Sequence, residues 1–99
     1  MASRQVSLSV NDTPIELDHF VRGLIEYVTG GIIAGLKGTG EIDTLGISIE
    51  GDRVTINLND GVVPTNLFVN KIIKSTIFGM VSSLKGVGEI EKLVISIKR

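Results

Sequence analysis

The chain has 99 residues, of which 42% are hydrophobic and 21% are charged, and its formal net charge at pH 7 is −1. This composition excludes a disordered chain and suffices for one domain with its own core, and the small net charge excludes a long-range field that attracts nucleic acid or anionic membranes. Cysteine is absent, which excludes disulfides, thiolate catalysis and thiolate-bound metals.

The first predicted element is a strand that begins near Val6. The apolar residues Val6, Leu8 and Val10 alternate with Ser7 and Ser9, which is the period-two pattern of a strand buried on one face.

A helix is predicted next. Apolar residues recur at helical spacing over residues 20–36. Asp18 is placed to cap the first turn, and Gly38 is placed just after the last turn, where glycine accepts a left-handed conformation. Alternation returns at Leu45, Ile47 and Ile49 and predicts a second strand.

The second half of the chain repeats this order. Alternation over residues 54–58 predicts a strand, Thr65 or Asn66 is placed to cap a helix that runs toward Gly86, and residues 93–97 close the chain as a strand. A shift of 48 positions aligns residues 4–51 with 52–99, and 17 of the 48 aligned pairs are identical. Gly51-Asp52 between the halves suits a two-residue hairpin. We therefore expect one pseudo-symmetric domain over residues 1–99, because two repeats are too few for a solenoid.

The order strand, helix, strand, strand, helix, strand predicts a ferredoxin-like α+β fold. With right-handed crossovers, the expected sheet has four antiparallel strands in the order 4-1-3-2 and two helices on one face. A strand-exchanged dimer of the two halves is the alternative. The other face of the expected sheet carries serine, threonine, glycine and asparagine without aromatic residues, so base stacking on RNA is not expected there.

The glycine pairs at Gly38 and Gly86 come after predicted helix ends, which disfavours phosphate binding because the helix dipole there has the wrong sign. The two Asn-Asp pairs are interpreted first as Asx turns. In the expected topology each pair also shares one end of the sheet with a lysine and a glutamate, which predicts two weak candidate ligand sites for a small zwitterion or a cation. The candidate ligand-binding residues are Asn11, Asp12, Lys85 and Glu89 at one end and Asn59, Asp60, Lys37 and Glu41 at the other.

Catalysis has little support in the sequence. His19 is the only histidine, so no histidine-based metal site or catalytic dyad is expected within one chain. No catalytic residue, metal ligand or cofactor is assigned. The alternative is an oligomeric enzyme whose carboxylate and lysine sites form between chains.

The predicted helices carry more apolar residues than one buried stripe requires, and the mean hydropathy is +0.35. We expect self-association through Ile33, Ile77, Phe78 and Val81. No signal sequence precedes the first strand, and the longest apolar stretch is shorter than the roughly 20 residues that cross a bilayer, so a cytoplasmic location without membrane or nucleic-acid partners is expected. The resulting hypothesis is a small self-associating binding or accessory module, with the sensing of a small ligand as one role open to it.

Overall fold

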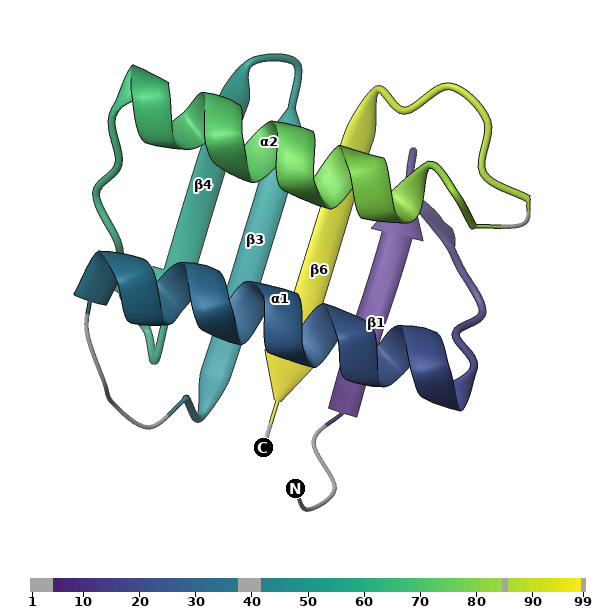
Figure 1. The fold of residues 1–99 in the computed structure, drawn as a ribbon, viewed down its shortest axis with the longest axis horizontal. Coiled ribbons are helices and arrows are strands. Elements are labelled where there is room, and N and C mark those ends of the chain that lie inside the picture. The colour runs from purple at the N-terminus through teal and green to yellow at the C-terminus, as the bar shows by residue number, and fades with distance from the viewer. Residues whose placement is uncertain (1–4, 38–41, 85, 99) are drawn as a thin grey trace.

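A computed structural model describes residues 5–37, 42–84 and 86–98, and it shows an α+β protein built in two layers. One antiparallel sheet forms the first layer, and two helices cross the same face of it as the second layer (Figure 1). The Cα atoms extend over 34 × 33 × 19 Å. The shortest of these dimensions leaves room for one sheet and one layer of helices only.

The sheet contains four long strands and two strands of two residues each. The long strands are β1 (Gln5–Val10), β3 (Thr44–Glu50), β4 (Arg53–Leu58) and β6 (Lys92–Lys98). The short strands are β2 (Thr13–Pro14) and β5 (Gly61–Val62). The helices are α1 (His19–Lys37) and α2 (Leu67–Val81).

The predicted four-stranded sheet in the order 4-1-3-2 is wrong, although the α+β class and the two helices on one face agree with the structure. The sheet has six strands in the order β2-β1-β6-β3-β4-β5. The strands that close the two halves, β3 and β6, lie at its centre, whereas the predicted order placed the opening strands there.

The Asn-Asp pairs explain much of this difference. Asn11 and Asp12 have positive φ angles of 51° and 66° and join Val10 directly to its cross-strand partner Thr13, as in a type I′ hairpin. The chain therefore turns back along the outer edge of β1 as β2, so α1 begins at that edge. In Figure 1 the chain then passes from β1 to β3 with the helices in front, and this crossover is left-handed, contrary to the common hand assumed from the sequence.

Residues 48 positions apart occupy matching places in the sheet. Ile47 pairs with Ile95 at the centre of β3 and β6, and the pairing of Leu8 with Ile95 matches that of Ile56 with Ile47. A pseudo-twofold axis of the strand pairing therefore passes between Ile47 and Ile95.

The predicted alternation in the strands is confirmed, since the apolar positions of all four long strands face the helices. Ile25 and Ile33 of α1 and Ile73, Ile77 and Val81 of α2 close the core from the other side. The buried strand residues are Leu8, Val10, Leu45, Ile47, Ile49, Val54, Ile56, Leu93, Ile95 and Ile97.

The predicted N-caps and the central hairpin are also found, whereas α2 ends at Val81, well before Gly86, and Gly38 lies outside the described residues. Val21 N donates to Asp18 Oδ1 at 2.8 Å, and Val69 N donates to Asn66 Oδ1 at 2.8 Å, so each helix begins where its cap predicted. Gly51 has a φ of 61° between the paired residues Glu50 and Arg53, which agrees with a primed hairpin turn.

Candidate functional site

The first candidate ligand cluster lies around the β1–β2 hairpin, where Asn11 bonds to the segment before β6. Asn11 Oδ1 accepts hydrogen bonds from Glu91 N at 2.8 Å and Lys92 N at 2.9 Å, and Asn11 Nδ2 donates to Glu89 O at 2.8 Å. These bonds fasten the hairpin to the strand beside it. Both the oxygen and the nitrogen of the Asn11 amide are therefore bonded within the chain.

The same cluster contains an exposed ion pair. Lys92 Nζ lies 3.3 Å from Asp12 Oδ1, and the Asp12 side chain is largely open to solvent. The structure thus brings Asn11 to the backbone of Glu89, and the described lysine that contacts Asp12 is Lys92. Lys85 lies outside the described residues.

The second candidate cluster lies around the β4–β5 hairpin. Asn59 and Asp60 have φ angles of 49° and 69°, and Asn59 Oδ1 accepts from Asp43 N at 2.7 Å and Thr44 N at 3.0 Å. Asp60 is exposed on the same turn. Lys37 is the last residue of α1, but its side chain and residue Glu41 lie outside the described part of the chain.

The four residues expected to mediate self-association lie mainly in the core. Ile33, Ile77 and Val81 are buried, and Phe78 is half-buried against the same cluster. A different set of side chains is left uncovered by the fold. The exposed large apolar residues of the helices are Phe20, Leu24, Tyr27, Leu67, Phe68 and Ile72.

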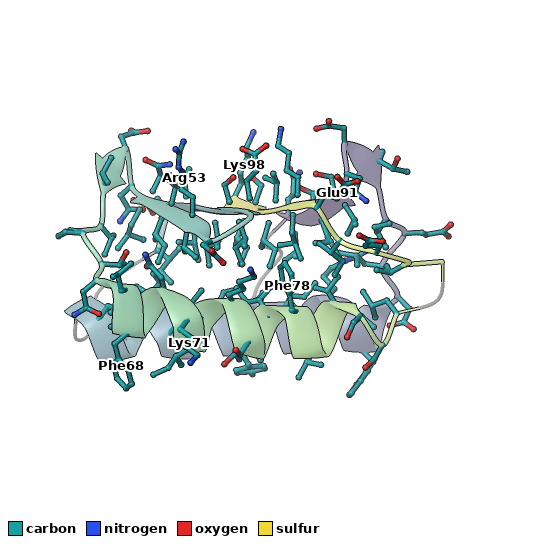
Figure 2. The ribbon with its side chains drawn as sticks, turned by 90° about the horizontal axis from the view of Figure 1, so that it is seen from above. Arg53, Phe68, Lys71, Phe78, Glu91 and Lys98 are labelled. Carbon is teal, nitrogen blue, oxygen red and sulfur yellow. The ribbon has the colours of Figure 1, made fainter. Side chains whose placement is uncertain are left out.

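These exposed residues lie on a surface that we call the outer helical face, defined as the side of α1 and α2 turned away from the sheet. Phe68 points away from the sheet in Figure 2. Phe20 and Phe68 occupy aligned positions in the two halves of the chain, and their side chains are 73% and 71% exposed. Two such exposed rings next to aliphatic side chains form an apolar patch of the kind that marks interaction sites.

Among the side chains that the structure describes, the exposed ones in the C-terminal half of each helix are small. In α1 the exposed residues after Tyr27 are Gly31, Ala34 and Gly35, and in α2 Gly79 follows Ser75 and Thr76. A Cβ atom built at Gly31, Gly35 or Gly79 meets no atom within 4 Å. Each helix therefore presents large side chains near its N-terminus, and near its C-terminus it presents small residues with open space above them.

A pocket of about 550 Å³ lies beside α2, next to the turn between β3 and β4. Its volume is within the range of small-molecule sites. Its walls combine charged, polar and apolar groups, since it is lined by Asp52, Leu67, Asn70, Lys71, Lys74, Ser75 and Phe78.

One cation of the pocket is held in place by two neighbours. Lys74 Nζ lies 3.2 Å from Asp52 Oδ1 and 5.5 Å from the centre of the Phe78 ring. The ion pair anchors the helix to the β3–β4 turn, and the cation–π contact orients the ring. Lys74 is thereby fixed at the wall of the pocket, with a side chain only 31% exposed.

Sequence reasoning missed this pocket because its lining comes from a hairpin turn and one face of a helix. A signal was nevertheless present in the aligned halves. Asn70, Lys71, Lys74 and Phe78 align with Arg22, Gly23, Glu26 and Gly30. The chemistry of the pocket is therefore specific to the second half of the chain.

The described residues offer no ready metal site or membrane span. Within the described ranges, no three histidine, aspartate or glutamate side chains converge as metal ligands, and His19 is exposed at the start of α1. No helix among the described residues is long and apolar enough to cross a membrane. No protein-family model matches the chain, and comparisons with curated proteins and with solved structures gave no match.

Proposed function

We propose that this protein is a non-catalytic assembly module that forms a homodimer through the outer helical face. The observation that carries the proposal is the gathering of six large apolar side chains on this face, three of them aromatic, with exposed fractions from 37% to 85%. Exposure of this apolar surface to water is unfavourable by roughly 25 cal/mol per Å². Burial against a second copy removes that cost.

The available area approaches what a specific dimer needs. An aromatic side chain buries about 150–250 Å² when covered, and Phe20, Tyr27 and Phe68 are each more than 70% exposed. These three rings offer roughly 400 Å² per protomer by that measure. The aliphatic residues and the small residues between them add to this, against about 800 Å² per partner in a standard interface.

The face is also complementary to itself. The helices run antiparallel across the sheet (Figure 1), so the bulky halves lie at diagonally opposite corners and the small halves at the other two. A twofold rotation about an axis parallel to the helices places the bulky half of α1 over the low C-terminal half of α2 in the second copy. An isologous interface of this kind requires such self-complementarity.

The test is sedimentation velocity over a concentration series for the wild type and for the double variant Phe20→Ser, Phe68→Ser. We expect the wild type to form dimers and the variant to dissociate at least about tenfold more readily, because truncated interface aromatics commonly cost more than 1 kcal/mol each. Circular dichroism checks that the variant keeps its fold.

Val62→Ser is the matched control for these changes. Val62 is 71% exposed, but it pairs with Asn57 in β4 and lies away from the outer helical face. Its replacement is expected to leave the dimer intact. A wild type that stays monomeric at all concentrations, or equal loss of dimer with Val62→Ser, contradicts the proposal.

A further inference from the structure

The pocket beside α2 contains two polar groups that lack partners among the described residues. Asn70 Oδ1 is withdrawn from solvent and accepts no hydrogen bond from any described donor. Lys71 is exposed at the rim and forms no ion pair with a described carboxylate. A buried acceptor without a donor is unfavourable in a folded protein, so the Asn70 amide calls for an explanation outside the chain's own contacts.

Asn70 and Lys71 would bind different chemical groups of a ligand. Asn70 Oδ1 needs a hydroxyl or N–H donor, and the ammonium group of Lys71 needs an anion. With Lys74 and Asp52, the charged lining sums to one positive charge, which favours an anion. Phe78 and Leu67 supply apolar surface for the rest of the molecule.

We propose that this pocket binds a small organic acid that carries an apolar ring or chain and one hydroxyl or N–H donor. The carboxylate or phosphate group of the acid pairs with Lys71, its donor bonds to Asn70 Oδ1, and its apolar body lies against Phe78 and Leu67. The Lys74–Asp52 pair is already formed without ligand, so Lys71 is the cation of the lining that remains to pair with the acid.

The aligned first half of the chain cannot form the same site. The positions of Lys71 and Phe78 are taken there by Gly23 and Gly30, and Lys74 is replaced by Glu26. One binding site per chain results from this difference. The pocket shares Leu67 with the outer helical face, but Phe20 and Phe68 do not line it. The dimer variant Phe20→Ser, Phe68→Ser therefore keeps the pocket lining unchanged, and titration of that variant separates ligand binding from dimer formation.

The first experiment titrates ¹⁵N-labelled protein with 3-phenyllactate and records amide and side-chain NMR shifts. This probe has a carboxylate, a hydroxyl donor and a ring. We expect saturable shifts at Asn70, Lys71 and Phe78 with a Kd of about 1 mM or tighter, as befits a molecule of this size. The absence of saturable shifts, or saturable shifts confined to other residues, overturns the proposal.

Two further probes and two variants measure separately how the hydroxyl group, the ring and the charge of Lys71 contribute to binding. 3-Phenylpropanoate lacks the hydroxyl donor and inorganic phosphate lacks the ring, so both are expected to bind at least several-fold more weakly. Lys71→Gln is expected to weaken the binding of 3-phenyllactate about tenfold, because it removes a charge-assisted contact. Arg53→Gln removes a cation on the sheet side of the molecule that does not line the pocket (Figure 2), and it is expected to leave Kd unchanged. Equal effects of the two variants overturn the proposal.

A stability measurement tests the role of Asn70 itself. Asn70→Leu removes the unpartnered acceptor and fills the pocket, so it is expected to abolish 3-phenyllactate binding and to raise Tm by a few degrees. The control Asn57→Leu changes an exposed amide of β4 and is expected to leave binding unchanged. A marked fall in Tm for Asn70→Leu shows that the amide serves the fold and overturns its assignment to a ligand.

Discussion

Replacement of Ile47 or Ile95 by alanine is expected to lower the free energy of unfolding by about 2–5 kcal/mol, which is the usual cost of a large-to-small change in a core. Both side chains have an exposed fraction of 0% and pair with each other at the centre of the sheet. The total free energy of unfolding of a domain of this size is roughly 5–15 kcal/mol. Each variant therefore loses a large share of its stability.

Urea denaturation of each variant measures this loss. Ile47→Val and Ile95→Val are expected to lose only about 0.5–1.5 kcal/mol, since they remove one methylene group each. Ser48→Ala, next to Ile47 on the open face of the sheet, is expected to change little. An Ile47→Ala variant as stable as Ser48→Ala contradicts the central position of β3 and β6.

The second large effect is expected from alanine at Asn11 or Asn59. Asn11→Ala removes three side-chain hydrogen bonds, each with a net value of about 1 kcal/mol. It also places alanine at a φ of 51°, where a left-handed conformation costs about 1–2 kcal/mol, and alanine lacks the short polar side chain that makes asparagine more tolerant of this region. Because the three bonds are exposed to solvent, each contributes at the low end of its usual range, and we expect a total loss of roughly 2–4 kcal/mol at Asn11 and a loss of the same order at Asn59.

Glycine separates the two causes, because Asn11→Gly tolerates the positive φ but still lacks the hydrogen bonds. We expect it to recover about 1 kcal/mol relative to Asn11→Ala. Asp12→Asn on the same turn removes only an exposed ion pair and is expected to cost less than about 1 kcal/mol. If Asn11→Ala is no less stable than Asp12→Asn, the amide is not fastening the hairpin to β6.

The local elements could be predicted from the sequence because each depends on neighbouring residues. Alternation identified the long strands, and Asp18 and Asn66 marked the starts of the helices. The strand order could not be predicted, because it depends on the path that the chain takes after β1. Asn11-Asp12 was compatible with an Asx turn in a loop and with a type I′ hairpin, and only the hairpin sends the chain along the outer edge of the sheet.

The candidate surfaces show the same limit. Both helices are apolar on more than one side, and the prediction that placed Ile77 on the exposed side is wrong, because Ile77 is buried and Phe68 is exposed. Packing decides this, because the sheet covers one stripe and leaves the other open. The α2 pocket depends on contact between the β3–β4 turn and α2, which the pattern of either segment alone does not contain.

The most direct test of the homodimer is an isotope-filtered NOE experiment on a mixture of ¹³C-labelled and unlabelled protein. Only contacts between two copies give signals in this experiment. We predict contacts between the rings of Phe20 and Tyr27 in one copy and the region of Ser75 to Gly79 in the other. Contacts confined to the open face of the sheet, or no intermolecular contacts in a sample shown to be monomeric, contradict assembly through the outer helical face.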